Sequence, residues 1–276
     1  MIKMEKNDYL YIDSSDSNDD TRQSRFIIPK TNKIDYLISE AKYAEALSLI
    51  EKTLKKDDAD YWLLKAEVYD NQKEYEKSID SINHALTLDE SDHIKIHKAN
   101  TLYNWAKVSY FPELEYEKAL KLIDEALDLL PKSEDPSEFY FLKGEILEAL
   151  REFVEAKKSY LIAHKEFDKL KEFESQVEYL NTTDDSLIII SGSYFYNFTA
   201  KNDLIVNLVK EEDNEHDPDA IAVYLDSEKI GYVANSDYTL IDEVKSASKI
   251  KNSLSDNAQA KILFVYLDEY IIAKIL

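Results

Sequence analysis

Residues 204–233 read LIVNLVKEEDNEHDPDAIAVYLDSEKIGYV, and their periodicity is that of strands, whereas the chain before them is patterned as helices. Two apolar, β-branched runs at 204–209 and 220–224 flank a polar loop. Three residues of this loop have turn chemistry: Asn214, Asp217 and Pro218. The stretch therefore predicts a pair of strands joined by a shaped turn.

The turn is expected to hold one conformation. Pro218 fixes its own φ and biases Asp217 towards extended backbone, so the loop should present His216 and Asp217 outward. Polar residues 226–229 return the chain into a strand at 230–233. Gly231 within that strand predicts a bulge or the close approach of another backbone segment.

An acidic turn (213–219, DNEHDPD), an AIAV strand (220–223) and IGYV (230–233), in this order, resemble the signature of the HIRAN domain. The resemblance implies that residues 186–276 form a small β-barrel of the OB or SH3-like kind, which recognises a nucleic-acid end or a peptide. In DNA-binding members a pocket takes the 3′ end of a single strand. Carried over to this chain, that pocket comprises Tyr194, Phe195, Tyr196, Asn214, His216 and Asp217.

The resemblance also implies a role for each pocket residue. His216 would stack on a base, Asp217 would accept a hydrogen bond from the terminal hydroxyl, and Phe195 or Tyr196 would offer a second platform. Tyr194 stands where those members have arginine, and acidic residues at 211–215 crowd the same mouth, so the charge that would hold a phosphate is lost. The alternative is that Phe195 faces the core while Tyr194 and Tyr196 cover the barrel surface.

The rest of the C-terminal third is also patterned as strands. We expect strands at 187–196, 258–267 and 270–276, and a helix at 238–247. Residues 181–185 are interpreted as the linker that precedes them.

Residues 31–166 repeat one pattern. The hexad occurs as KYAEAL (42–47), EYEKSI (74–79), EYEKAL (115–120) and EFVEAK (152–157). It resembles the tetratricopeptide repeat, whose period is about 34 residues. An aromatic residue that opens the second helix of each pair, with a small residue three positions later, lets neighbouring helices approach closely. The fold class is therefore an α-solenoid of helix pairs over residues 31–182, followed by the barrel.

Two departures from the regular repeat are visible. Extra residues at 108–114 predict a lengthened helix or a projecting loop, broken at Pro112. Residues 167–180 place Leu170, Phe173, Val177 and Leu180 on one stripe, which predicts a capping helix that shields the last repeat from water.

The first helices of tetratricopeptide repeats line a groove. The matching positions here are Asp60, Leu63, Glu67, Asp70, Asn71, His93, Ile96, Asn100, Tyr103, Asn104, Glu138, Phe141, Glu145 and Glu148. This lining is acidic and lacks the basic residues that hold a terminal carboxylate in some members. A partner protein, or a peptide with basic and aromatic side chains, is the expected ligand; a solvated face without a fixed ligand is the alternative.

Composition excludes several classes. The net charge of −22 argues against general affinity for phosphate backbones. No cysteine is present, so disulfides and thiolate zinc sites are impossible. Without a signal segment or an apolar run long enough to span a bilayer, we expect a cytoplasmic protein with no membrane contact. Residues 1–30 are acidic and polar, and are interpreted as a mobile tail whose most ordered part is 26–29.

No catalytic, metal or cofactor site is expected. Only three glycines occur, so a phosphate-cradling loop cannot be built. The alternating acids of residues 213–219 lack the glycine and glutamate of a calcium loop, and His93 and His97 lack a third ligand. The sequence thus predicts a non-enzymatic adaptor, with a DNA 3′-end sensor that recruits a separate helicase or nuclease as the alternative.

Overall fold

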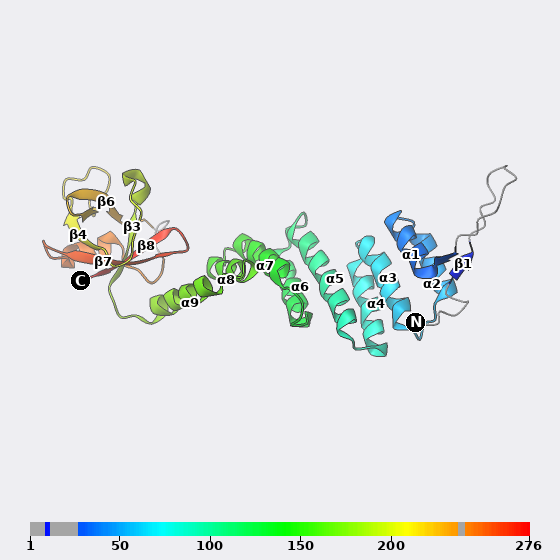
Figure 1. Ribbon diagram of the computed structural model, residues 1–276. Helices are drawn as coiled ribbons and strands as arrows, with labels where there is room; N and C mark the ends of the chain where they lie inside the picture. The colour runs from blue at the N-terminus through cyan, green and yellow to red at the C-terminus, as the bar shows by residue number, and fades with distance from the viewer. Residues whose placement is uncertain (1–8, 12–26, 237–240) are drawn as a thin grey trace, which may run out of the picture. The chain divides into compact units, whose positions relative to one another are not determined.

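The computed structural model describes residues 9–11, 27–236 and 241–276, and side chains from Lys33 onward (Figure 1). These residues divide into two compact units, Met1–Glu152 and Phe153–Leu276. The first unit is helical apart from one short strand pair, and the second combines helices with a closed barrel.

The first unit is a succession of helix pairs. Its helices are α1 (Lys30–Ser39), α2 (Tyr43–Thr53), α3 (Ala59–Asn71), α4 (Tyr75–Leu88), α5 (Asp92–Tyr110), α6 (Tyr116–Leu129) and α7 (Ser137–Ala149). Before them, β1 (Tyr9–Tyr11) pairs antiparallel with β2 (Ile27–Pro29), so the predicted tail contains paired backbone; most of its other residues lie outside the described ranges.

The repeated hexad marks the start of a helix and a close helix contact, as predicted. Helices α2, α4 and α6, and α8 (Phe153–Ala163) in the second unit, each begin at the aromatic residue of a hexad. The small residue three positions later is almost fully buried in every case: Ala46, Ser78, Ala119 and Ala156. Ser78 also donates its hydroxyl to the carbonyl of Ala66 on α3 at 2.9 Å, which ties α4 to its partner helix.

The same type of turn precedes each of these four helices and the helix that follows α8. A non-glycine residue with positive φ occurs two positions before the helix start, at Ala41, Lys73, Leu114, Arg151 and Lys165. The next residue donates its amide back into the preceding helix, as Glu74 does to the carbonyl of Tyr69 at 2.9 Å. These are left-handed helix ends, which close the helix and reverse the chain. The turn at Lys165 leads into α9 (Phe167–Thr182), so the repeat geometry continues to that helix.

The insertion in the third repeat lengthens its first helix. α5 has 19 residues and ends at Tyr110, immediately before Phe111 and Pro112. Proline cannot donate the amide that a further helical turn would need, which explains the stop. The predicted break at Pro112 is confirmed.

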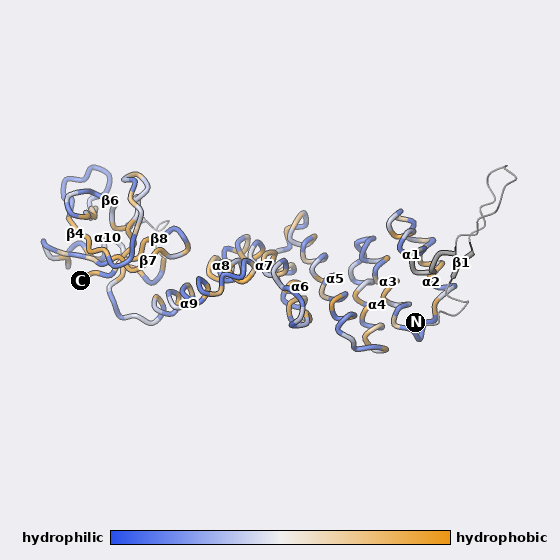
Figure 2. The backbone as a smooth tube through the Cα atoms, in the orientation of Figure 1, coloured by the Kyte–Doolittle hydropathy of each residue, from blue (hydrophilic) through white to orange (hydrophobic). Residues whose placement is uncertain are grey.

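The second unit contains the barrel. Strands β3 (Leu187–Ser191), β4 (Ile205–Lys210), β5 (Ile221–Leu225), β6 (Glu228–Val233), β7 (Gln259–Tyr266) and β8 (Tyr270–Ile275) close in the order β3-β6-β5-β4-β7-β8. Every pairing is antiparallel. Alternate residues such as Val206, Leu208, Ile221 and Val223 fill the interior. In Figure 2 the hydrophobic segments gather within the barrel, whereas its connecting loops are hydrophilic.

Strand β3 is buried on both faces. Ile188 and Ile190 point into the barrel core, while Leu187 and Ile189 belong to a second cluster with Phe173 of α9. The predicted apolar stripe of the capping helix therefore packs on the outside of the barrel. This packing places α8 and α9 in the same unit as the strands, whereas the sequence placed the division at residues 182–186.

Two local predictions are wrong. The strand expected over 187–196 ends at Ser191, and a 3₁₀ turn, η1 (Ser193–Tyr196), follows because Gly192 adopts a left-handed conformation. Of the helix expected over 238–247, the described residues 241–246 are not helical, and a helix begins at Ala247, as α10 (Ala247–Ile250); residues 237–240 lie outside the described part.

The prediction for Gly231 is confirmed. The pairing of β5 with β6 shifts register beside it, and a Cβ at this position would lie 2.5 Å from the carbonyl oxygen of Ser191. Only glycine lets β6 approach β3 this closely.

Candidate functional site

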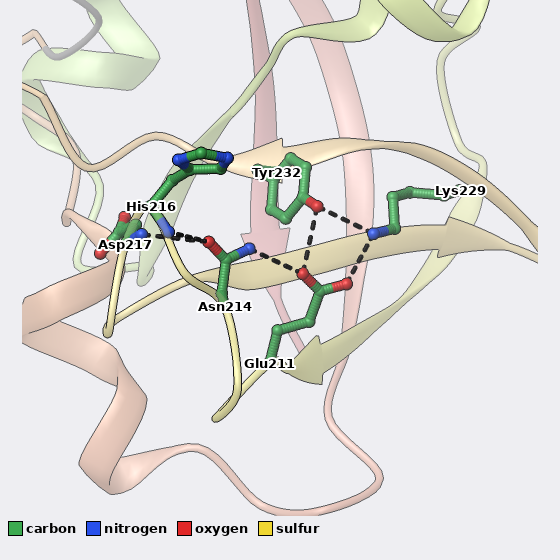
Figure 3. Close-up of polar contacts among 6 residues, drawn as sticks. All are labelled: Glu211, Asn214, His216, Asp217, Lys229 and Tyr232. Atoms are coloured by element: carbon green, nitrogen blue, oxygen red, sulfur yellow. Dashed lines mark hydrogen bonds and ion pairs between the residues drawn. The ribbon is translucent and has the colours of Figure 1, made fainter.

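The turn between β4 and β5 is held by one asparagine (Figure 3). Asn214 Oδ1 accepts hydrogen bonds from the backbone amides of His216 and Asp217, both at 3.0 Å. This Asx-type arrangement replaces backbone pairing within the loop. Because the backbone of His216, rather than its ring, takes part, the ring stays exposed, as predicted.

A charged network supports this turn from the strands. Glu211 Oε1 lies 2.6 Å from Lys229 Nζ, which also donates to the Tyr232 hydroxyl at 2.8 Å. That hydroxyl donates to Glu211 Oε2 at 3.1 Å, and the same oxygen accepts from Asn214 Nδ2 at 2.9 Å (Figure 3). The network therefore connects β6 to the residue that shapes the turn.

The network changes the ionisation of its members. The hydrogen bond from Lys229 is the main cause that lowers the pKa of Glu211, and the hydrogen bond to Glu211 is the main cause that raises the pKa of Lys229. Both groups are therefore charged at neutral pH. Their side chains are only 25% and 23% exposed, so the pair is partly shielded from salt.

Asp217 is occupied by contacts within the barrel. Its carboxylate accepts from the Asp219 amide at 2.8 Å and from Asn235 Nδ2 at 3.0 Å. Asn235 in turn accepts from the Ser248 amide at 2.9 Å, which connects the turn to α10. The resemblance gave Asp217 the role of receiving a terminal hydroxyl, but here it also shapes the loop.

A cavity of about 710 Å³ opens beside the turn. Its lining residues come from β3, the turn, β6 and the segment after β6: Ser191, Asn214, His216, Asp217, Ala220, Tyr232, Val233, Asn235 and Ser236. The structure thus brings together Asn214, His216 and Asp217 around one hollow.

The aromatic run lies on η1, at the end of β3. Tyr194 and Phe195 are 86% and 83% exposed, so the alternative in which Phe195 faces the core is wrong. Tyr196 is less exposed, and its ring centroid lies 6.4 Å from that of Tyr232, which lines the cavity. The end of the aromatic turn therefore adjoins the cavity through Tyr196.

Carboxylates in the first unit gather where α1, α3 and α5 meet. Burial is the main cause that raises the pKa of Glu67, and the charges of Asp35 and Asp70 add to it. Burial likewise raises the pKa of Asp70. Asp70 Oδ2 accepts from Asn104 Nδ2 of α5 at 3.0 Å. No donor reaches its buried Oδ1 with hydrogen-bond geometry among the described residues, although the Thr101 hydroxyl offsets part of the rise in pKa.

Aromatic side chains and further acids continue this surface onto α7. Burial raises the pKa of Tyr103, and the charges of Glu138 and Glu145 add to the rise. The Tyr103 ring lies 5.0 Å from that of Phe139. We call the surface formed by Asp35, Glu67, Asp70, Tyr103, Asn104, Glu138 and Glu145 the acidic face.

The other predicted groove residues are placed as follows. Leu63 is a core residue, packed with Ala66 and Ile82 and only 8% exposed, so its assignment to the groove is corrected. Asp60, Asn71, His93, Asn100, Phe141 and Glu148 are exposed, and Ile96 is half-buried. The His93 and His97 rings meet edge to face at 4.7 Å, and burial lowers the pKa of His97.

Several site residues were not found from the sequence. Glu211, Lys229, Tyr232 and Asn235 act through contacts between distant positions; Glu211 and Lys229, for example, are 18 positions apart in the sequence. Glu211 follows β4 and Lys229 lies on β6, with β5 between these strands in the barrel, so no local pattern in the sequence indicates the pair. In the described part of the chain, no group of three or more potential ligands is arranged to hold a metal ion. Nor does any described helix combine the length and apolarity needed to cross a bilayer.

The first helix pairs match a family of helical repeats. Residues 31–93 match the family described as tetratricopeptide repeat. The solved structures that resemble the chain include a crystal structure of MamA, with 18% identity over 52% of this chain and 83% of that one and a TM-score of 0.34. A further MamA structure, MamA AMB-1, has 22% identity over 49% of this chain and 76% of that one, with a TM-score of 0.31. No curated protein matches the chain.

Proposed function

We propose that the protein is a non-enzymatic adaptor whose acidic face binds a segment of a partner protein that carries basic and aromatic side chains. The tetratricopeptide repeats support an interaction scaffold. One observation carries the choice of ligand: Glu67 and Asp70 are partly buried, mutually repelling carboxylates with raised pKa values. Partly buried carboxylates that repel one another at a surface are candidates for a binding site.

A basic side chain would relieve this arrangement. An ammonium or guanidinium group placed beside Glu67 and Asp70 compensates the charges of both carboxylates. The half-buried Tyr103 ring, which packs against the buried Phe139 ring, would contact the apolar part of the partner segment. Charge complementarity of this kind raises association rates and selects against acidic partners.

Charge reversal on the full-length chain tests this proposal. The triple variant Glu67→Lys, Glu138→Lys and Glu145→Lys should bind an immobilised Lys- and Phe-containing peptide library at least about tenfold more weakly, and should recover fewer partners from a lysate. The matched control is Asp80→Lys, Glu90→Lys and Asp128→Lys, which changes the net charge equally at exposed positions away from the acidic face. Equal losses in both triple variants would show that overall charge, not the acidic face, is responsible.

The barrel is proposed as a second binding surface, which recognises the end of a nucleic-acid strand or a peptide. The cavity supports it, because Asn214, His216 and Asp217 line one hollow as the HIRAN resemblance implies. One form of this function is a sensor of single-stranded DNA 3′ ends. Fluorescence anisotropy at low salt with oligonucleotides that end in a 3′-hydroxyl or a 3′-phosphate tests it; binding without end preference would contradict it.

A further inference from the structure

We infer that the surface formed by the cavity and by Tyr194 and Phe195 of η1 binds a lysine- or arginine-bearing peptide segment rather than a nucleic acid. This inference rests on the proposed role of the barrel as a binding module and specifies its ligand. We call this surface the barrel site.

The aromatic part of the barrel site is free to receive a ligand. Tyr194 and Phe195 expose most of their side chains, and their rings meet at an angle of 76° with centroids 6.0 Å apart. Two large exposed rings side by side are unusual on a surface that binds nothing, because their burial by a partner is favourable. The face of an aromatic ring also attracts a cation.

The charge beside the cavity selects the ligand. Six of the nine residues at 211–219 are Asp or Glu. Lys229 neutralises Glu211, whereas Glu212, Asp213 and Glu215 project into solvent. Lys251 does contact the turn, where it donates to the carbonyl oxygen of Pro218, but one ammonium group leaves the rim strongly negative.

The cavity lining reinforces this preference. Among the described lining residues there is no Lys or Arg, and their one carboxylate, Asp217, is already hydrogen-bonded to Asn235. A phosphate entering here would face carboxylates without a compensating cation, which costs free energy. An ammonium or guanidinium group would meet carboxylates at the rim and exposed aromatic rings on η1, which adjoins the cavity through Tyr196, and the neutral amides and hydroxyls of the lining suit a peptide backbone.

Photo-crosslinking on the full-length chain tests the inference. The probe is the peptide acetyl-Gly-Lys-Bpa-Lys-Gly-amide, where Bpa is benzoylphenylalanine, and the matched control carries acetylated lysines. Because the acidic face should bind the same probe, crosslinks are mapped by mass spectrometry. We expect one set near residues 191–217 and 232–236, lost on acetylation, and a separate set on α3–α7.

Variants separate the two sites. Tyr194→Ala with Phe195→Ala, both exposed and therefore harmless to folding, should weaken the barrel crosslinks about tenfold and leave those on the helices unchanged. Glu212→Gln, Asp213→Asn and Glu215→Gln together should do the same. Glu67→Gln with Glu145→Gln should weaken only the crosslinks on the helices. A failure of the proposal for the acidic face can therefore be distinguished from a failure of the inference for the barrel site.

Three results would overturn the inference. One is the absence of lysine-dependent crosslinks on the barrel while those on the helices are present. Another is barrel crosslinking that survives acetylation, which would show that charge does not select the ligand. The third is displacement of the barrel-bound probe by a ten-nucleotide oligothymidylate at 150 mM salt, which would assign the barrel site to nucleic acid.

Discussion

Glu211 and Glu67 make the stability of the folded protein depend on pH in opposite directions. In Glu211, the hydrogen bond from Lys229 lowers the pKa, so its contribution to stability is present at neutral pH and is lost as the pH falls through the lowered value. In Glu67, burial raises the pKa, so the folded state holds the proton more tightly than the unfolded chain. Stability then decreases as the pH rises through the raised value, and Glu67 destabilises the first unit at neutral pH.

We therefore predict that Glu67→Gln stabilises the first unit at pH 7. The gain should be modest, roughly 0.5 kcal/mol or less, because part of the side chain is in solvent and is screened. The gain should shrink as the pH is lowered towards 4, where the wild-type carboxyl is also protonated. Thermal unfolding of both proteins across this pH range measures it. The control variant Glu90→Gln changes an exposed loop position, so its unfolding temperature should equal that of the wild type at every pH in this range.

Gly231 lies where β6 approaches β3 too closely for any side chain. Gly231→Ala places a methyl group 2.5 Å from the Ser191 carbonyl oxygen, so β3 and β6 must separate. We expect a loss of about 2 kcal/mol or more, together with weaker binding at the cavity, because Ser191 and Tyr232 both line it. Chemical denaturation followed by circular dichroism checks the stability. Gly192→Ala is the comparison: it also strains a left-handed residue, but its Cβ meets nothing closer than 3.9 Å, so its loss should be smaller.

At the scale of the element, α9 shows how far a pattern in the sequence reaches. The stripe of Leu170, Phe173, Val177 and Leu180 correctly predicts an amphipathic helix, but it cannot show which apolar surface the helix covers. The missing information lies in β3, where the run LIII at 187–190 is apolar on both faces. A strand with one solvated face alternates, so this run indicates a cover on the outer side. The cover is α9 with Leu161 of α8.

The packing of α9 on the barrel yields a matched pair of substitutions. Phe173 is 3% exposed and stacks on Tyr266 with centroids 5.6 Å apart, so Phe173→Ala should destabilise the second unit by about 3–5 kcal/mol. Phe167 begins the same helix but is 59% exposed, so Phe167→Ala should cost less than about 1 kcal/mol. Denaturant titrations of both variants measure the difference. Similar losses would mean that the cluster of α9 with β3 and β7 contributes little.

At the scale of the whole molecule, local periodicity predicted which elements form, and most strand positions were found within a residue or two. The site was predictable only where its residues lie close together in sequence, as Asn214, His216 and Asp217 do. The partners that hold the site, Lys229, Tyr232 and Asn235, depend on barrel closure. The end of β3 at Ser191 was missed because Gly192 turns the chain while the aromatic residues after it still favour a strand.

The sequence pattern placed the boundary between the two units at residues 182–186, whereas the structure places it between Glu152 and Phe153. Truncated fragments test which boundary gives a stable unit. A fragment of residues 153–276 keeps α8 and α9 over the outer face of β3, so we expect a cooperative thermal transition and a well-dispersed amide spectrum. A fragment of residues 186–276 leaves Leu187, Ile189, Tyr266 and Ile272 without Leu161, Phe173 and Leu180. Exposure of such a patch costs about 25 cal/mol for each Å² and favours association. The shorter fragment should therefore aggregate or melt at a clearly lower temperature. If it were as stable as the longer one, the barrel would be self-sufficient and α9 would be a cap of the helical repeats alone, as the periodicity of residues 167–180 first indicates.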